Sequence, residues 1–248
     1  MIKVSFLGTN GWYDTNTGNT VCTLIEAKDF FIVLDAGNGI YKLDKYIKNS
    51  KPVYIFLSHF PLDHIAGFHV LAKFNFRQIV RIFGQPGTKN ILNDLMRQPF
   101  TLPINKLPFR VLVHELPVSL KQLPFKVRYN ELVHSARCFG YRFEIDGKAI
   151  AYCTDTGACA GARELAKGAD LLISECSLAS GTKLDEWPHM NPQDAAGLAK
   201  AAGVKKLALT HFDASIYTDI KKRKEAQAAA RKIFRNTFAA LDGSCVKI

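Results

Sequence analysis

Polar residues of the kinds that bind metal ions follow several apolar, strand-like runs of this 248-residue chain. They are His59, Asp63 and His64 after PVYIFLS, His134 after FKVRYNELV, Asp155 after KAIAYCT, and His211 after KKLALT. A single histidine is a weak indicator, because most histidines belong to the core or the surface. Four separate strand-like runs that are each followed by His or Asp are a stronger indicator, since side chains at the strand ends converge at one rim of a layered sheet. Imidazole and carboxylate together bind zinc, and manganese and iron accept the same donors.

The segments that must position these residues predict strands and helices in layers. Strand patterns cover IKVSFLG, NTVCTLIEA, FFIVLDAG, PVYIFLSH, FKVRYNELVH, ADLLISEC and KKLALTH, and FGYRFEIDGKAIAYCTD predicts a hairpin with an Asp-Gly turn at 146–147. Residues 64–76 and 87–97 look helical, 99–124 are strand-like between prolines, and 219–241 predict a basic helix. NPQDAAGLAKAAG predicts a helix with Asn191 as N-cap, Pro192 at its first position and Gly203 as its stop. Strand-rich halves that are each followed by helix indicate an α/β protein of layered sheets with helices outside.

The composition fits one large domain over residues 1–248, because 48% of the residues are apolar and no low-complexity segment interrupts them. No run approaches the roughly 20 apolar residues of a membrane span, and MIKVSFLG reads as a strand rather than a signal peptide. The six cysteines form no CxxC pair, which favours reduced, core-filling thiols of a cytoplasmic protein.

The charge balance suggests an anionic partner. Lysine and arginine outnumber the acidic residues 33 to 22, which gives a net charge of +11. Such a surplus suits a small phosphate ester or a nucleic acid. A basic surface that is merely solvated explains it as well, and the basic cluster of residues 221–235 carries the same two interpretations.

The motifs resemble those of the metallo-β-lactamase superfamily, whose signature is HxHxDH followed by a distant His, a bridging Asp and a last His. SHFPLDH matches the first motif, VHSARCFGYRFE looks like the third-histidine segment, AYCTDTG like the bridging-Asp segment and LALTHF like the last-histidine segment. IVLDAGNG resembles the early Asp-Gly motif, and HMNPQDAAGLAKAAGVKKLALTHF is similar to the ribonuclease Z branch. The resemblance covers roughly residues 1–215 and implies a four-layer αββα sandwich.

The same resemblance implies a metal centre with one or two ions per chain, zinc by default and manganese or iron as alternatives. The implied ligands are His59, His134 and Asp155 for a first site, and Asp63, His64, Asp155 and His211 for a second, with Asp155 shared. Pro61 stands where the motif has its second histidine and offers no side-chain donor. The first site therefore lacks one ligand, and an open coordination position can still hold water or substrate.

Catalytic roles also follow from the resemblance. Asp63 would orient the metal-bound hydroxide that attacks the substrate. His189 would stabilise the developing oxyanion or protonate the leaving group. Asp35 would support the site from beside it.

The implied activity is metal-dependent hydrolysis, and the principal hypothesis is a phosphodiesterase that acts on a phosphate ester or nucleic-acid-derived substrate. Many ribonuclease Z proteins carry a tRNA-gripping arm between the positions that match His134 and Asp155, and here only 21 positions separate those residues. A thioester or lactone hydrolase of the same superfamily stays open as an alternative. So does a non-catalytic nucleic-acid- or metal-binding homologue, and a homodimer is left open in each case.

Overall fold

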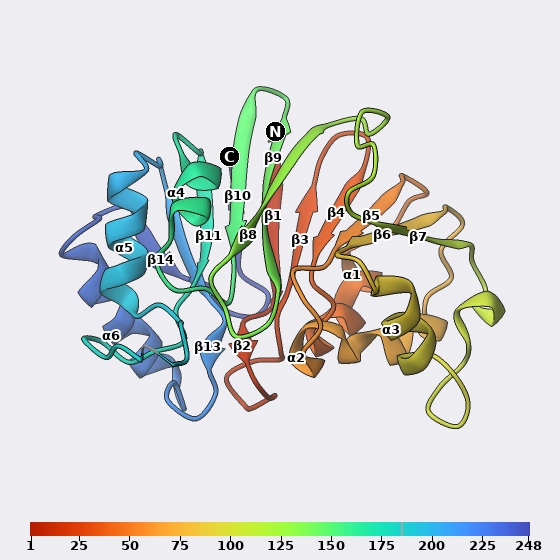
Figure 1. The fold of residues 1–248 in the computed structure, drawn as a ribbon, viewed down its shortest axis with the longest axis horizontal. Coiled ribbons are helices and arrows are strands. Elements are labelled where there is room, and N and C mark those ends of the chain that lie inside the picture. The colour runs from red at the N-terminus through yellow and green to blue at the C-terminus, as the bar shows by residue number, and fades with distance from the viewer. Residues whose placement is uncertain (185) are drawn as a thin grey trace.

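The computed structural model describes residues 1–184 and 186–248, and it confirms the four-layer αββα arrangement. Two sheets pack face to face and carry helices on their outer faces, as Figure 1 shows. The helices over one sheet are α4 (Ala160–Ala166), α5 (Pro192–Ala201) and α6 (Ile220–Arg231). Those over the other are α1 (Leu43–Tyr46), α2 (Leu62–Ile65) and α3 (Thr88–Leu95), with 3-10 turns η1 (Asn38–Lys42), η2 (Ala66–Lys73) and η3 (Ile104–Lys106) in the same half.

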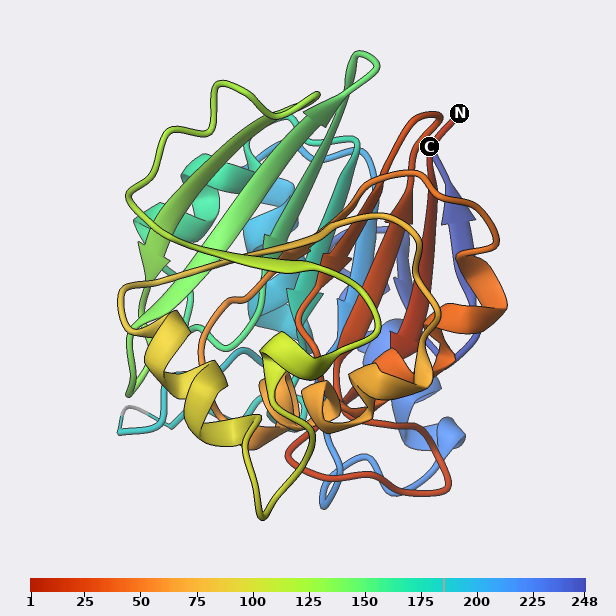
Figure 2. The same ribbon diagram turned by 90° about the vertical axis from the view of Figure 1, so that its right-hand side faces the viewer.

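Each sheet combines parallel and antiparallel strands. In spatial order the first sheet holds β15 (Cys245–Lys247), β1 (Lys3–Gly8), β3 (Cys22–Glu26), β4 (Phe31–Leu34), β5 (Val53–Phe56), β6 (Val80–Gly84) and β7 (Val111–Glu115). The second holds β14 (Thr237–Ala239), β12 (Leu207–Thr210), β11 (Leu171–Glu175), β10 (Lys148–Cys153), β9 (Cys138–Ile145) and β8 (Lys126–Leu132). Because β1 pairs with β15, the two chain ends lie side by side, as Figures 1 and 2 both show.

Three apolar layers alternate with the four structural layers. Phe6, Phe56, Phe143 and Tyr152 belong to the layer between the sheets, which draws side chains from both. A second layer joins the second sheet to α4, α5 and α6, and a third joins the first sheet to its own helices. Burial of both sheet faces explains why the central strands read as continuous apolar runs instead of alternating ones.

The strand directions bring several strand ends to one rim. Strands β10, β11 and β12 run parallel to one another, and β8 is antiparallel to β9, which is antiparallel to β10. Strands β4 and β5 are parallel in the first sheet. Two short strands, β2 (Asn10–Gly11) and β13 (Phe212–Asp213), follow β1 and β12 and pair with each other, so they tie the two sheets together at this rim.

The predictions of secondary structure are most accurate at turns and helix ends, where the residue types determine the backbone conformation. The hairpin between β9 and β10 turns at Asp146 and Gly147, which both have positive φ (48° and 75°), as its tight turn requires. The side chain of Asn191 accepts hydrogen bonds from the first turn of α5, and Gly203 ends that helix with φ of 64°. Both features confirm what the sequence predicts.

The predicted helix at 219–241 is wrong beyond Arg231. Helix α6 stops there, and residues Thr237–Ala239 form β14 beside β12. Phe238 packs into the layer between the sheets while Ala239 faces the helices, so the side chains alternate as in a strand. The strand-like interpretation of 99–124 is also mostly wrong, because that segment contains only the five-residue strand β7 and the short turn η3.

The basic cluster on α6 is not a uniformly solvated face. Arg223 is fully buried, donates a hydrogen bond to Thr9 Oγ1 over 2.8 Å, and lies 4.8 Å from the ring centroid of Phe212. The prediction of core-filling cysteines holds for four of the six, since Cys159 is half-buried and Cys245 is exposed. Over residues 1–184 and 186–248, the structure contains no helix with the length and apolarity to cross a membrane.

Candidate metal centre

Every residue predicted to bind metal or to act in catalysis lies at the rim where the strand ends meet. A pocket of about 480 Å³ is lined by His59, Asp63, His134, Asp155, His189 and His211. His64 is fully buried against this group. The topology accounts for the convergence. His59, His134, Asp155 and His211 follow the carboxyl ends of β5, β8, β10 and β12, whereas Asp63 and His64 lie on α2 and His189 lies just before α5.

The tightest group consists of Asp63, His64, Asp155 and His211. His64 Nε2 lies 3.1 Å from His211 Nε2, 3.1 Å from Asp155 Oδ2 and 3.6 Å from Asp63 Oδ2. His211 Nε2 lies 3.2 Å from Asp63 Oδ2 and 3.3 Å from Asp155 Oδ1. Neighbouring ligands of one tetrahedral zinc ion are about 3.3 Å apart, given metal–ligand bonds of about 2.0–2.1 Å. These five separations therefore suit a shared metal ion.

Hydrogen bonds behind the site orient two of the imidazoles. Asp35 is fully buried and accepts four hydrogen bonds: from Ser58 N (2.7 Å), Ser58 Oγ (2.8 Å), Tyr152 Oη (2.6 Å) and His64 Nδ1 (2.9 Å). The Ser58 hydroxyl donates to Asp35, so its oxygen accepts from His59 Nδ1 at 2.9 Å. In their neutral forms both imidazoles therefore carry the proton on Nδ1, and Nε2 is the nitrogen that they offer to a metal. This arrangement fits metal ligands, whose second nitrogen is usually held by such a partner.

His211 is oriented in the same way by a serine. The Ser177 hydroxyl donates to the carbonyl oxygen of His211 at 3.0 Å, and its oxygen therefore accepts from His211 Nδ1, also at 3.0 Å. The Nε2 atom of His211 is left to face Asp63 and Asp155. Three histidines from three different segments consequently turn the same nitrogen, Nε2, away from their serine or aspartate partners.

The charges around the site favour a bound cation. Burial alone would lower the pKa of His64, but three neighbouring carboxylates raise it well above its usual value. Burial would also lower the pKa of His211, but the neighbouring carboxylates, Asp155 above all, raise it above its usual value. Burial would raise the pKa of Asp155, but the two imidazoles hold it well below its usual range. The carboxylates therefore stay ionised, and positive charge, as protons or as a divalent metal, stabilises them.

The residues of the implied first site are less completely built. His59 Nε2 is buried without a hydrogen-bond partner, which is costly for a polar atom and suits a ligand atom that waits for a metal. Burial and the neighbouring His64 lower the pKa of His59 to about 3, so its imidazole is neutral. His134 is half-buried and held only by a 3.4 Å contact between its Nδ1 and the Ala136 N–H. Pro61 lines the pocket here without a donor, so this group offers fewer supported donor atoms than the other.

His189 is paired with a carboxylate that the sequence reasoning missed. Its Nδ1 lies 2.9 Å from Oε1 of Glu175, which is fully buried at the end of β11. Burial lowers the pKa of His189, but Glu175 overcomes this effect and raises the pKa to about 9. His189 is therefore protonated at neutral pH and lies at the pocket with a proton to donate. Its ligand atom and those of His134 and Asp155 lie within 4.8 Å of one another.

The backbone around the centre is strained. Trp12, Asp35, Asp155 and His211 have φ of 73°, 56°, 48° and 51°, the left-handed region that non-glycine residues seldom adopt. Such conformations cost about 1–3 kcal/mol each and are typical of functional sites. Gly11 passes so close to His211 that an added Cβ would lie 2.5 Å from the imidazole, so only glycine fits there.

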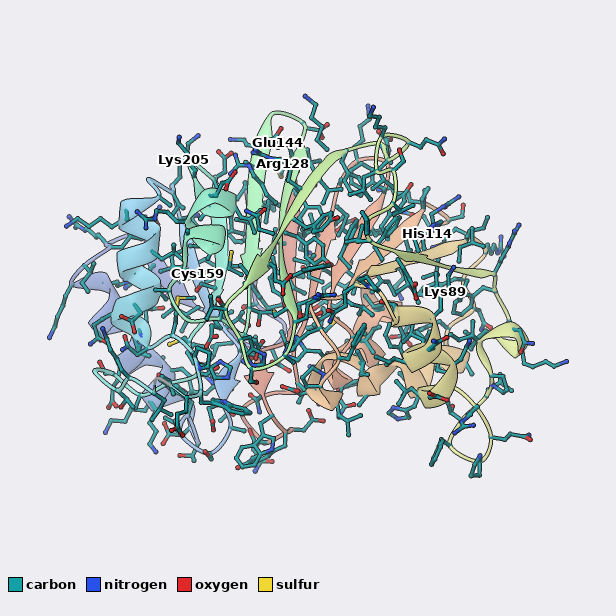
Figure 3. The ribbon with its side chains drawn as sticks, in the orientation of Figure 1. Lys89, His114, Arg128, Glu144, Cys159 and Lys205 are labelled. Carbon is teal, nitrogen blue, oxygen red and sulfur yellow. The ribbon has the colours of Figure 1, made fainter. Side chains whose placement is uncertain are left out.

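Two histidines lie apart from the centre. His114 stacks on Phe83 in the first sheet, and Figure 3 shows it with Lys89 on the α3 side of the molecule, away from β2 and β13. His69 is exposed, and its Nδ1 contacts the carbonyl oxygen of Ala66. Neither belongs to the groups of possible ligands found among the described residues. Glu175, the partner of His189, could have been predicted from the sequence as the metal ligands were, since it stands at the end of an apolar strand run.

Comparison with known proteins agrees with this geometry. The family described as "Beta-lactamase superfamily domain" matches residues 31–212. The Bacillus subtilis protein named "Probable metallo-hydrolase YhfI" is 26% identical over 215 residues, which cover 85% of this chain and 87% of that protein. Ribonuclease Z of Methanothermobacter thermautotrophicus is 26% identical over 306 aligned residues, which cover 100% of this chain and 97% of that protein. That alignment is longer than this chain, so this relative contains segments that the chain lacks.

Solved structures share the fold over nearly the whole chain. The crystal structure of the metallo-β-lactamase fold protein YhfI from Bacillus subtilis superimposes with a TM-score of 0.82 at 23% identity and covers 99% of this chain and 98% of that one. Human tRNase Z, short form, gives a TM-score of 0.76 at 25% identity and covers 99% of each chain.

Proposed function

The chain belongs to the metallo-β-lactamase superfamily, in the branch that includes ribonuclease Z, and we propose that it is a phosphodiesterase within this group of metal-dependent hydrolases. The observation that carries the proposal is the cluster of Asp63, His64, Asp155 and His211, with its ligand spacing and with Nε2 of both imidazoles beside the carboxylates. We further propose that residues 1–248 act as one catalytic domain.

The proposed ligands follow the two groups described above. Asp63, His64, Asp155 and His211 hold the stronger site, because their spacing and their hydrogen-bonded supports are complete. His59, His134 and Asp155 hold the weaker one. The chemistry of the donors suits zinc, and manganese or iron would accept the same set. When bound, the metal supplies a water of lowered pKa and polarises the ester that is attacked.

Asp63 and His189 carry the remaining catalytic work in this proposal. The Asp63 carboxylate is fixed by the Trp12 N–H, which donates to Oδ2 over 2.8 Å, so it can orient the attacking water. His189 holds a proton through its pair with Glu175 and can deliver it to the leaving-group oxygen. An imidazolium at this position also stabilises negative charge that develops on the substrate.

A phosphate ester is favoured over other esters by the relatives, of which one is named a metallo-hydrolase and another ribonuclease Z. A small substrate is favoured over tRNA by the segment between His134 and Asp155. This segment consists of the β9–β10 hairpin, with no room for an arm that could grip RNA.

The test compares ester classes with one preparation. Protein purified without chelators is assayed for metal content and for hydrolysis of bis(p-nitrophenyl) phosphate, a thioester and a lactone. We expect at least one metal ion per chain and turnover of the diester, both removed by chelation. Asp155→Asn keeps the side-chain volume and should lose both, while His114→Gln, far from the pocket, should change neither. Turnover of the thioester or lactone alone would refute the proposal, and so would salt-sensitive RNA binding without any turnover.

A further inference from the structure

The chain has only two tryptophans, and both line the pocket of the metal centre. The side chain of Trp12 is 67% exposed and that of Trp187 is 54% exposed. Tryptophan is usually largely buried, because its ring is the largest apolar surface a residue can remove from water. Two exposed rings at one pocket therefore need an explanation other than packing.

The backbone conformation of Trp12 is a second reason to expect a role for its side chain. Its φ of 73° is the left-handed conformation, which is unfavourable for a bulky residue and free of cost for glycine. The contact that this loop makes with the site comes from the Trp12 backbone, whose N–H donates to Asp63 Oδ2. A glycine would donate the same hydrogen bond without strain. The indole ring is thus required neither by the backbone nor by burial.

The two tryptophans adjoin different residues of the centre. The backbone N–H of Trp12 donates to Asp63 and its neighbour Gly11 lies against His211, so Trp12 lines the pocket beside the proposed stronger metal site. The ring centroid of Trp187 lies 6.1 Å from that of His134 and 6.0 Å from that of His189, beside the proposed weaker metal site. A phosphodiester has one substituent on each side of its phosphorus. With the phosphate at the centre, one tryptophan is available to each substituent.

The charge of the pocket argues against a long nucleic acid. No lysine or arginine is among the described residues that line it, although the chain contains 33 such residues, and Asp213 adds a further carboxylate. Figure 3 shows Arg128 and Lys205 at the end of the sheets opposite to β2 and β13. Binding of a polynucleotide relies on a basic groove that follows its backbone. A volume of about 480 Å³ is instead typical of a site for one small molecule.

We propose that Trp12 and Trp187 bind the substrate through its aromatic substituents, and that the substrate is a small phosphodiester with at least one nucleobase-sized ring. The inference rests on the proposed phosphodiesterase function and narrows its substrate class. Stacking on an indole face recognises a base without a charged partner, which suits a pocket that lacks basic residues.

The test measures binding to the metal-loaded protein by calorimetry, with adenosine 5′-monophosphate and ribose 5-phosphate as matched probes with and without a base. We expect the nucleotide to bind at least about fivefold more tightly. The single variant that removes the ring on which its one base stacks, Trp12→Gly or Trp187→Leu, should weaken binding by about 5- to 100-fold, as loss of one stacked base does. The double variant should bind both probes equally. Trp12→Gly should melt no lower than the wild type, because glycine relieves the strained φ.

Equal binding of the two probes to the wild type would overturn the inference, and so would a double variant that still prefers the nucleotide. A change in oligomeric mass of the variants would also overturn it, because the rings would then cover an interface between two copies. Hydrolysis of bis(p-nitrophenyl) phosphate separates the two proposals. Turnover without base preference refutes the aromatic site alone, whereas base preference without turnover supports the aromatic site and refutes the phosphodiesterase.

Discussion

Replacement of Asp35 by asparagine should weaken metal binding although Asp35 is not one of the proposed ligands. Asp35 accepts four hydrogen bonds with its two oxygens, and Asn has only one carbonyl oxygen. If the amide nitrogen takes the place of Oδ1, it faces the Ser58 backbone N–H, and two donors oppose each other. If it takes the place of Oδ2, it donates to His64 Nδ1 and moves the imidazole proton to Nε2. In that tautomer His64 cannot bind a metal through the nitrogen that faces the pocket.

The size of the effect follows from the role of a ligand's outer partner. Loss of such a partner lowers metal affinity by about 10- to 100-fold, which corresponds to about 1.4–2.8 kcal/mol. Folding should suffer as well, since at least one buried donor loses its charged acceptor at a cost of about 1–3 kcal/mol. The substitution adds no backbone strain, because Asn tolerates the left-handed conformation that Asp35 adopts at φ of 56°.

The assay is competition for zinc with a chromophoric chelator, together with thermal unfolding of the metal-free protein. Tyr152→Phe is the matched control, because it removes one donor to Asp35 and leaves the His64–Asp35 bond. It should destabilise the fold but change zinc affinity by less than about tenfold, the lower bound for an outer partner of a ligand. Wild-type zinc affinity in a folded Asp35→Asn protein would refute the reasoning that Asp35 sets the tautomer of His64.

Three further predictions concern the ligands and the proton donor. Pro61→His restores the missing donor and should raise the affinity for a second metal ion by more than about tenfold; unchanged metal content by elemental analysis would contradict the assignment of Pro61. Asp155→Ala should remove more metal than His59→Ala, because Asp155 is shared by both proposed sites, and equal losses would argue against sharing. In metal-free protein, NMR titration should show His189 protonated up to about pH 9, and Glu175→Gln should move the midpoint toward the ordinary value near 6.5. Folding raises the pKa of His189, so the stabilisation from the His189–Glu175 pair is complete below about pH 6.5 and is lost as the pH rises through about 9. If the difference in free energy of unfolding between the wild type and Glu175→Gln did not change with pH, this prediction would be wrong.

The sequence by itself determined which residue types stand at the strand ends. A strand run that ends in His59, Asp155 or His211 is visible in a window of ten residues, and parallel strands bring such ends to one rim whatever the details of packing. Turn and cap chemistry is equally local, which is why Asn191 and the turn at 146–147 were predicted correctly. Long-range pairing overrode the local pattern at Thr237–Ala239, where a strand beside β12 replaced the predicted helix.

Only the tertiary structure decided how these residues work together. The contacts that orient the site join residues far apart in the chain: 29 positions separate His64 from Asp35, and 148 separate His211 from Asp63. Such contacts decide which nitrogen of each histidine faces the pocket and where the proton of His189 lies. The position of Trp12 depends on its contact with Asp63 and on a left-handed backbone conformation that the surrounding packing imposes. Local sequence patterns carry no signal for these features, because each arises from groups that meet only after both sheets have packed together.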